Sequence, residues 1–257
     1  MSDYNKPIEK KMVKAKLNGK YEMILPKHRA DRPDWYTEEG WERARLDALH
    51  DEIKRQVKAG IQPVVYYVGA EEGEMPALCQ MWGAQVMMFE PNPLVLPNIK
   101  AIWEANELEP PLALFVGFAS NVTDLEPPQQ DPLAVGFTPE WPEAAYGELI
   151  GNHGFKELYQ EADAFPQIKL DDVAEMLPKP TIISFDCEGS EWQVMKGAEQ
   201  LLKNDKPVIF ASISPEFMFH QFNQYSRDFR NWLIDFGYKE TFLDYQHELH
   251  TVYEPIK

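Results

Sequence analysis

Two glycines and an acid in the first half of the sequence have the types and spacing of a nucleoside-binding site. An apolar run at residues 64–68 stops at Gly69, and a second run at residues 86–89 stops at Glu90. Between Gly69 and Gly73 the backbone can turn sharply and approach a ligand closely. A carboxylate at the tip of the second strand can accept hydrogen bonds from both hydroxyls of a ribose. The pattern predicts a ribose site in outline.

The spacing of the two glycines bears on the ligand. Gly69-x-x-x-Gly73 lacks the dinucleotide fingerprint G-x-G-x-x-G. A loop for pyrophosphate is therefore not expected, and a nicotinamide-dependent oxidoreductase ranks well below other functions. A nucleoside without phosphates, such as S-adenosylmethionine, fits better. Many α/β proteins without a nucleoside also have a glycine turn and an acid at a strand end, so these residues alone leave that alternative open.

A second group of acids follows the buried-strand pattern at residues 181–185. Asp186 stands at the carboxyl end of the strand, and Glu188 and Glu191 share the turn into the next helix. They should face the same crevice as the nucleoside site. The alternative is structural, because acids before a helix stabilise its N-terminus. Clustered carboxylates also suit Mg²⁺, but no histidine completes a recognisable set by spacing, so no metal site is assigned.

An α/β sheet with helices on both faces must position these residues. The sequence predicts seven strands, of which the last two form an antiparallel hairpin, at residues 64–68, 86–89, 112–118, 181–185, 207–213, 238–243 and 249–253. Helices are expected after Gly73 and at about residues 37–58, 93–106, 190–202 and 225–236.

Two segments stand apart from this alternation. Residues 1–60 are expected to form an arm and a packing helix, with the basic cluster of residues 10–20 as a solvated arm or a contact for an anionic partner. Residues 61–257 form the main domain, interrupted at about 122–165 by a proline-rich, acidic insertion. We expect this insertion to cover the mouth of the active site. His153 is its titratable group near pH 7, or an ordinary loop histidine.

Composition excludes some partners. The formal charge of −17 argues against nucleic acid, because affinity for nucleic acid depends on neutralising phosphates. No apolar run approaches the roughly 20 residues that a membrane span needs. Cys79 and Cys187 are expected to be reduced thiols, so we expect a cytoplasmic protein. The oligomeric state cannot be inferred.

The chain resembles the FkbM-type S-adenosylmethionine-dependent methyltransferases in the segments VVYYVGAEEG, MMFEPNP, FDCEGSEWQVMKGA and WLIDFGY. The similarity covers about residues 62–243, and the blocks D-x-E-G-x-E and F-E-P-x-P are specific in combination. The resemblance implies a Rossmann-like class I methyltransferase sheet of seven strands with the last one antiparallel. It also implies S-adenosylmethionine as cofactor and methylation of a hydroxyl on a sugar, glycan or related small molecule.

The resemblance also implies roles for individual residues. Gly69 and Gly73 match the glycine loop around the methionine part of the cofactor, and Glu90 matches the acid on the ribose. Ala119 and Ser120 fall where the adenine edge is usually contacted. The acids of the D-x-E-G-x-E block, Asp186, Glu188 and Glu191, match positions next to the reactive methyl.

The chain departs from the family where an Asp normally stands two residues before the first glycine. Tyr67 takes this place, and a phenol cannot hold the charged amino group of the cofactor as a carboxylate does. Glu71 is expected to supply the missing charge from the loop. Ser212 and Ser214 stand where the family tends to have an acid. These departures leave open a cofactor-binding or scaffold protein without catalysis.

For an active enzyme, two acids are the first candidates for the chemistry. Asp186 or Glu188 would orient the acceptor hydroxyl or remove its proton, with His153 or His220 as the alternative base. Structural capping by Glu188 and Ser190 is the competing interpretation.

Overall fold

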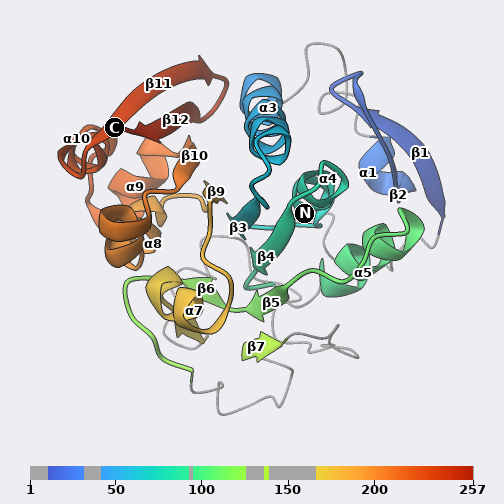
Figure 1. The fold of residues 1–257 in the computed structure, drawn as a ribbon, viewed down its shortest axis with the longest axis horizontal. Helices are drawn as coiled ribbons and strands as arrows, with labels where there is room; N and C mark the ends of the chain where they lie inside the picture. Colours follow the sequence, from blue (N-terminus) through green and yellow to red (C-terminus); the bar gives the residue numbers. More distant parts are fainter. Residues whose placement is uncertain (1–10, 32–41, 93–94, 126–135, 139–165, 257) are drawn as a thin grey trace.

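A sheet of eight strands forms the centre of the computed structural model, which describes residues 11–31, 42–92, 95–125, 136–138 and 166–256 (Figure 1). The strand order is β11-β12-β10-β9-β3-β4-β5-β7. The strands are β3 (Val64–Val68), β4 (Gln85–Phe89), β5 (Ala113–Val116), β7 (Gly136–Thr138), β9 (Ile182–Asp186), β10 (Val208–Ile213), β11 (Tyr238–Tyr245) and β12 (Leu249–Pro255).

The directions of the strands confirm the predicted sheet. The five strands from β10 to β5 are parallel. β12 is antiparallel to both of its neighbours, β10 and β11. The seven predicted strands are therefore present with the last one antiparallel, as in a Rossmann-like methyltransferase sheet. β7 is an unpredicted addition that pairs antiparallel with β5.

Successive strand residues face opposite sides of the sheet, and each side is covered by its own helices. In β3, Val65 and Tyr67 join one apolar cluster, and Val64, Tyr66 and Val68 join the other. Figure 1 shows the helices of the first cluster on one side of the sheet, namely α3 (Arg43–Lys58), α4 (Glu74–Met81) and α5 (Leu96–Ala105). The other side carries α7 (Leu170–Met176), α8 (Glu191–Lys196), α9 (Pro215–Phe222) and α10 (Ser226–Asp235).

The N-terminal segment differs from the expected solvated arm. Residues Met12–Leu17 form β1, residues Tyr21–Pro26 form β2, and these strands pair as a hairpin that is followed by the short helix α1 (Lys27–Ala30). The lysines on β1 are exposed, but Leu17 and Leu25 are fully buried. Burial of these two leucines stabilises the packing of the hairpin on the rest of the domain. The basic composition of the segment gave no indication of this packing.

Two hydrogen bonds hold the hairpin to α5. The amide of Asn106 accepts from the backbone N–H of Ile24 at 2.8 Å and donates to its carbonyl at 2.8 Å. Side chains of the hairpin and of α3 share one apolar cluster with the sheet. A division of the chain at residue 60 stays a prediction.

Several element boundaries also differ from the prediction. The predicted strand at 112–118 breaks at Gly117, because the following β6 (Phe118–Ala119) leaves the main sheet and pairs with β8 (Gln167–Ile168). The predicted helix at 190–202 ends at Lys196 and is followed by a π-helical turn at Leu201–Asp205.

Candidate active site at the carboxyl end of the sheet

The glycine turn after β3 lies directly against the end of β9. Gly69 has a φ of +79°, and a β-carbon added to it would lie 1.8 Å from the carbonyl oxygen of Asp186. Gly73 has a φ of +92° and precedes α4, with the side chain of Ile99 3.0 Å from an added β-carbon. Both positions therefore require glycine, the first for a close approach of two backbones and the second for its conformation.

Glu90 is buried at the end of β4 and orders the same turn. One carboxylate oxygen accepts from the backbone N–H of Glu71 at 2.8 Å, and the other accepts from that of Asn92 at 2.8 Å. Burial raises the pKa of Glu90 to about 8, although these two N–H groups act in the opposite direction. With its pKa raised to about 8, the carboxyl group of Glu90 is mostly protonated near neutral pH.

An arginine from the N-terminal segment holds the outer side of the turn. Arg29 of α1 is fully buried and donates to Glu74, with Nε at 2.8 Å from the carboxylate, and to Glu71 at 2.9 Å. Beside it, His28 lies 2.9 Å from Glu72. The carboxylate of Glu71, which was expected to supply a free charge for the cofactor, is therefore paired with Arg29.

The second predicted group of acids gathers at the end of β9. Asp186 is half-buried, and burial, followed by the charges of Glu248 and Glu42, raises its pKa well above the ordinary value. Glu188 has a φ of +44°, and burial raises its pKa to about 7. The charge of Glu188 also contributes to the raised pKa of Glu90. The acids at the ends of β4 and β9 therefore lie at one edge of the sheet, and a shared crevice stays a prediction.

Glu191 has a structural position in the same turn. Its side chain is fully buried, and one oxygen accepts from the backbone N–H of Gly189 at 3.1 Å and of Ser214 at 3.0 Å. Burial raises the pKa of Glu191 to about 7. This carboxyl group joins the turn after β9 to the end of β10.

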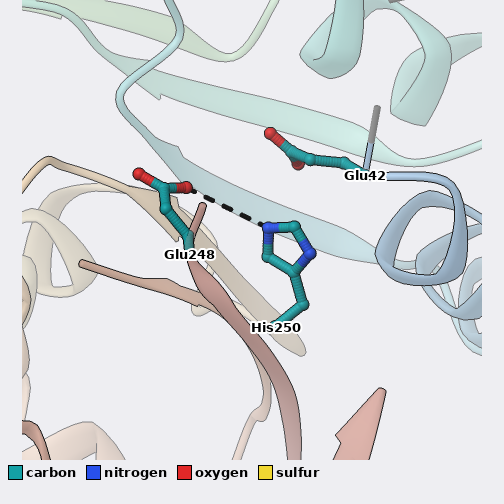
Figure 2. A group of neighbouring side chains, drawn as sticks. All are labelled: Glu42, Glu248 and His250. Atoms are coloured by element: carbon teal, nitrogen blue, oxygen red, sulfur yellow. Dashed lines mark ion pairs between the residues drawn. The ribbon is translucent and has the colours of Figure 1, made fainter. Parts of the chain in front are cut away.

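Beyond Asp186, two glutamates and a histidine come together from distant parts of the sequence (Figure 2). Glu42 precedes α3, and Glu248 and His250 lie at the start of β12. One ligand atom from each lies within 4.8 Å of the others. The hydroxyls of Ser212 and Ser214 donate to Glu248, the latter at 2.8 Å.

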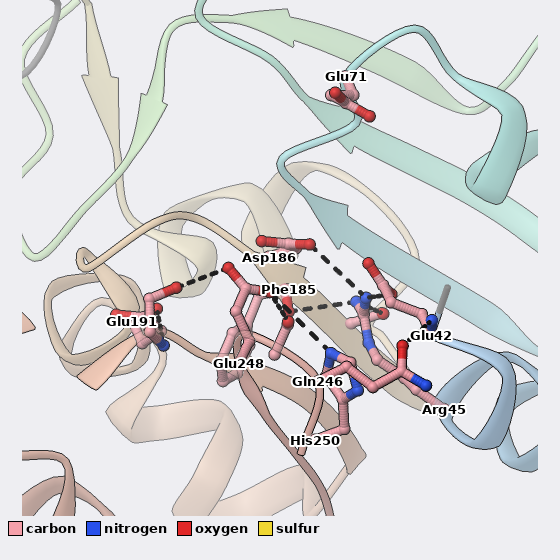
Figure 3. A network of polar contacts seen from close by, with 12 residues as sticks. Glu42, Arg45, Glu71, Phe185, Asp186, Glu191, Gln246, Glu248 and His250 are labelled. Atoms are coloured by element: carbon pink, nitrogen blue, oxygen red, sulfur yellow. Dashed lines mark hydrogen bonds and ion pairs between the residues drawn. The ribbon is translucent and has the colours of Figure 1, made fainter. Parts of the chain in front are cut away.

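Arg45 of α3 connects this group to the end of β9 (Figure 3). Its buried guanidinium donates to Glu42, to the hydroxyl of Ser184 at 2.9 Å and to the carbonyl of Phe185 at 3.2 Å. It lies 4.0 Å from Asp186. Burial opposes ionisation of Glu42, but Arg45 and then His250 hold its pKa below the ordinary value.

Tyr67 faces the same guanidinium. Its side chain is buried, and the guanidinium carbon of Arg45 lies 5.8 Å from the centre of its ring. Such an arrangement is typical of a cation–π contact. The phenol that replaces the expected acid thus packs on the arginine that pairs with Glu42.

The remaining predicted site residues lie on other segments of the chain or outside the described residues. Ala119 and Ser120 are buried at the β6–β8 pair, where the N–H of Ser120 donates to the carbonyl of Ile168 at 2.9 Å. The N–H of Gly117 donates to the carbonyl of Glu90 at 3.3 Å, so this segment begins beside the Glu90 backbone. His153 lies outside the described residues, and His220 is exposed on α9.

The blocks that form this site fall within a known domain. The family model of the methyltransferase FkbM domain matches residues 67–240, which include the glycine turn, Glu90 and the acids after β9. The chain belongs to the FkbM methyltransferase family. S-adenosylmethionine is accordingly its cofactor.

Solved structures similar to this FkbM-family chain are distant methyltransferases and related proteins. A precorrin-6y methyltransferase from Geobacter metallireducens GS-15 is 13% identical over 81% of this chain and 86% of its own, with a TM-score of 0.42. A magnesium protoporphyrin IX methyltransferase from Synechocystis PCC 6803, solved with bound S-adenosylmethionine, is 12% identical over 82% and 78%, with a TM-score of 0.39. Fibrillarin from Methanococcus jannaschii is 13% identical over 75% and 66%, with a TM-score of 0.43. No curated protein matches the chain.

The site of this FkbM-family chain contains charged residues that sequence reasoning missed. Arg29, Glu42 and Arg45 precede the matched domain, and Glu248 and His250 follow it. Arg45 stands next to Leu46 in the apolar stripe of α3, and His250 stands inside the last strand pattern. A charged or titratable residue within an apolar pattern was the available signal, since such residues are seldom buried without a partner.

Among the described residues, no helix is long and apolar enough to cross a membrane.

Proposed function

We propose that the chain transfers a methyl group from S-adenosylmethionine to a hydroxyl of a sugar, glycan or related small molecule. The observation that carries the proposal is the contact between the Gly69 turn and the carbonyl of Asp186, which an added β-carbon would approach to 1.8 Å. This contact brings the cofactor end of the sheet and the D-x-E-G block together at one edge. The acids at that edge are then available to both reactants.

Glu90 is well suited to the ribose of the cofactor. Each of its oxygens accepts one backbone N–H at 2.8 Å, which leaves further lone pairs for hydroxyl donors. With a pKa raised to about 8 by burial, the carboxyl group can also donate near neutral pH. Bound S-adenosylmethionine supplies an electrophilic methyl group on a sulfonium.

Asp186 and Glu188 are assigned to the acceptor. Burial raises the pKa of Glu188 to about 7, which is close to the optimum for a general base at physiological pH. Asp186, whose backbone touches the glycine turn, orients the hydroxyl. Alignment of the acceptor oxygen with the methyl group lowers the activation barrier by several kcal/mol, on the order of what orientation contributes in intramolecular reactions.

An uncharged polar acceptor agrees with the electrostatics. The formal charge of −17 and the carboxylates around Asp186 repel phosphate-rich substrates. A sugar or glycan presents hydroxyls without such repulsion. Location in the cytoplasm stays a prediction.

A second function is favoured by one observation. Tyr67 stands in place of the family's acid, and Arg45 lies 5.8 Å from its ring, so a cation occupies the neighbourhood of the expected carboxylate. A protein that binds the cofactor without catalysis is the corresponding alternative.

Calorimetry and product detection distinguish the two functions. S-adenosylmethionine is titrated into the wild type and into Glu90→Gln, and release of S-adenosylhomocysteine is then measured with a panel of sugars, glycosides and phenols. An enzyme binds the cofactor, loses affinity in Glu90→Gln and methylates a member of the panel. Asp186→Asn should abolish turnover, whereas the matched exposed variant Asp235→Asn should not. Binding without product from any acceptor supports the non-catalytic alternative, and failure to bind refutes both.

A further inference from the structure

Three potential metal ligands converge next to the proposed active site. Glu42 approaches from the start of α3, and Glu248 and His250 approach from the start of β12 (Figure 2). Their nearest ligand atoms lie within 4.8 Å of one another. Bonds to a transition metal are about 2.0–2.2 Å long, so small side-chain movements bring all three atoms onto one ion.

The imidazole of His250 is aimed into this group without a partner. The residue is 1% exposed, and its Nε2 has no hydrogen-bond partner among the described residues. Nε2 lies 4.0 Å from the carboxylate of Glu248, a distance too long for a hydrogen bond. A buried polar atom without a partner costs free energy, which a bound cation would recover.

The other ring nitrogen is fixed in the way that metal-binding histidines usually are. Nδ1 of His250 lies 2.6 Å from the carboxylate of Asp244. A hydrogen bond from Nδ1–H to a carboxylate leaves the lone pair on Nε2 and fixes the orientation of the ring. The tautomer selected by Asp244 is therefore the one that binds a cation through Nε2.

Both glutamates are also held by neighbours. Ser214 donates to one oxygen of Glu248 at 2.8 Å, and Ser212 donates to the other. Arg45 donates to one oxygen of Glu42. The two carboxylates retain lone pairs that can bind a cation.

We propose that Glu42, Glu248 and His250 bind one divalent first-row transition-metal ion, of the class of Mn²⁺, Co²⁺ or Zn²⁺. The imidazole ligand favours these ions over Mg²⁺ and Ca²⁺, which prefer oxygen ligands. The competing state is a metal-free group in which a protonated His250 lies between Asp244 and Glu248. The site and its test do not depend on methyl transfer.

Metal titration of chelator-treated full-length protein tests the proposal directly. Mn²⁺ binding is followed by the loss of the free-ion electron paramagnetic resonance signal, and Co²⁺ binding by its visible absorption. The wild type should bind one ion of each per chain, with nitrogen hyperfine coupling to bound Mn²⁺. Absence of stoichiometric binding, or binding without a nitrogen ligand, overturns the proposal.

Variants identify the ligands. His250→Gln and Glu248→Gln should weaken binding at least tenfold, whereas the exposed-histidine control His220→Gln should bind as the wild type does. Asp244→Asn keeps all three ligands and should weaken binding about 10–100-fold by releasing the imidazole. Thermal melting checks that each variant is folded. Unchanged affinity in folded His250→Gln excludes this site.

A separate measurement keeps the two proposals apart. Calorimetry with S-adenosylmethionine on the metal-free protein reports the cofactor site alone. Cofactor binding without metal binding refutes the cation site and leaves the proposed function intact. Metal binding without cofactor binding refutes the proposed function and leaves the cation site intact.

Discussion

The backbone carbonyl of Asp186 occupies the place beside Gly69 that any side chain would need, since an added β-carbon would lie 1.8 Å from its oxygen. A strand-to-helix turn and the end of a neighbouring strand are thereby locked together. The acids carried by these segments keep a fixed relation to one another.

Gly69→Ala should disrupt this contact. Gly60→Ala is the matched control, because Gly60 also has a positive φ, +74°, but no atom lies within 4 Å of an added β-carbon. The control carries only the conformational cost, about 1–2 kcal/mol. Gly69→Ala should cost a further 1–3 kcal/mol or so through overpacking, and it should weaken cofactor binding at least tenfold. Urea unfolding and calorimetry measure both effects, and equal losses in the two variants would contradict the account.

Arg45→Met should be strongly destabilising. The change leaves Glu42 buried without its arginine and leaves the hydroxyl of Ser184 without its donor. Breaking a buried ion pair from one side typically costs about 3–5 kcal/mol. Arg43→Met, on the exposed side of the same helix, should change the free energy of unfolding by about 0.5 kcal/mol or less. A loss of less than about 1 kcal/mol in Arg45→Met would show that the network is not structural.

Glu90 should make stability fall as pH rises. Its pKa is about 8 in the folded protein against an ordinary value of 4.5, so between these values the folded state binds more protons than the unfolded state. The stabilisation is complete below pH 4.5 and is lost as pH rises through about 8. The slope from this residue is at most about 1.4 kcal/mol per pH unit.

Unfolding curves of the wild type and Glu90→Gln between pH 5 and 8.5 measure this contribution. Other buried acids contribute to both curves, so the difference isolates Glu90. The exposed control Glu199→Gln should keep the slope of the wild type. Parallel profiles for the wild type and Glu90→Gln would rule out a raised pKa.

Glu188→Gln should affect turnover more than binding. A base with a pKa of about 7 gives the wild type a rate that rises with pH through that value and then levels off. With an acceptor from the panel, the variant should lose the rise and about 10²–10⁴-fold in kcat. Affinity for S-adenosylmethionine should change by no more than a few-fold. An unchanged pH–rate profile would assign the proton transfer to another group.

The sheet could be predicted because its strands carry uninterrupted apolar runs. All five residues of β3 are buried, and its alternating side chains supply both apolar clusters. The N-terminal hairpin escaped prediction because its exposed lysines dominate the composition, although Leu17 and Leu25 are buried. The break at Gly117 depends on pairing with β8, a contact of distant segments that no local pattern contains.

The placement of Glu90 and Asp186 at one edge of the sheet also followed from the sequence, since strand ends in a parallel sheet meet at that edge. The cationic partners did not follow from it. Arg29 and Arg45 reach the site from helices whose sequence distance to it is large, and their burial depends on acids contributed by other elements. Glu71 illustrates the limit, because its expected free charge is paired with Arg29. Spacing along the chain carries no information about such pairs.

Arg29 has a consequence for any shortened form of the protein. The matched family domain begins at residue 67, yet the guanidinium that pairs with Glu71 and Glu74 comes from Arg29, which lies 38 residues upstream of that boundary. A fragment trimmed to the domain would leave mutually repelling anions around its cofactor loop. Such a fragment would keep the residues of the cofactor loop but lose the cation that holds them in place. A loss of cofactor affinity in it would therefore reflect repulsion between the loop glutamates rather than absence of the binding residues.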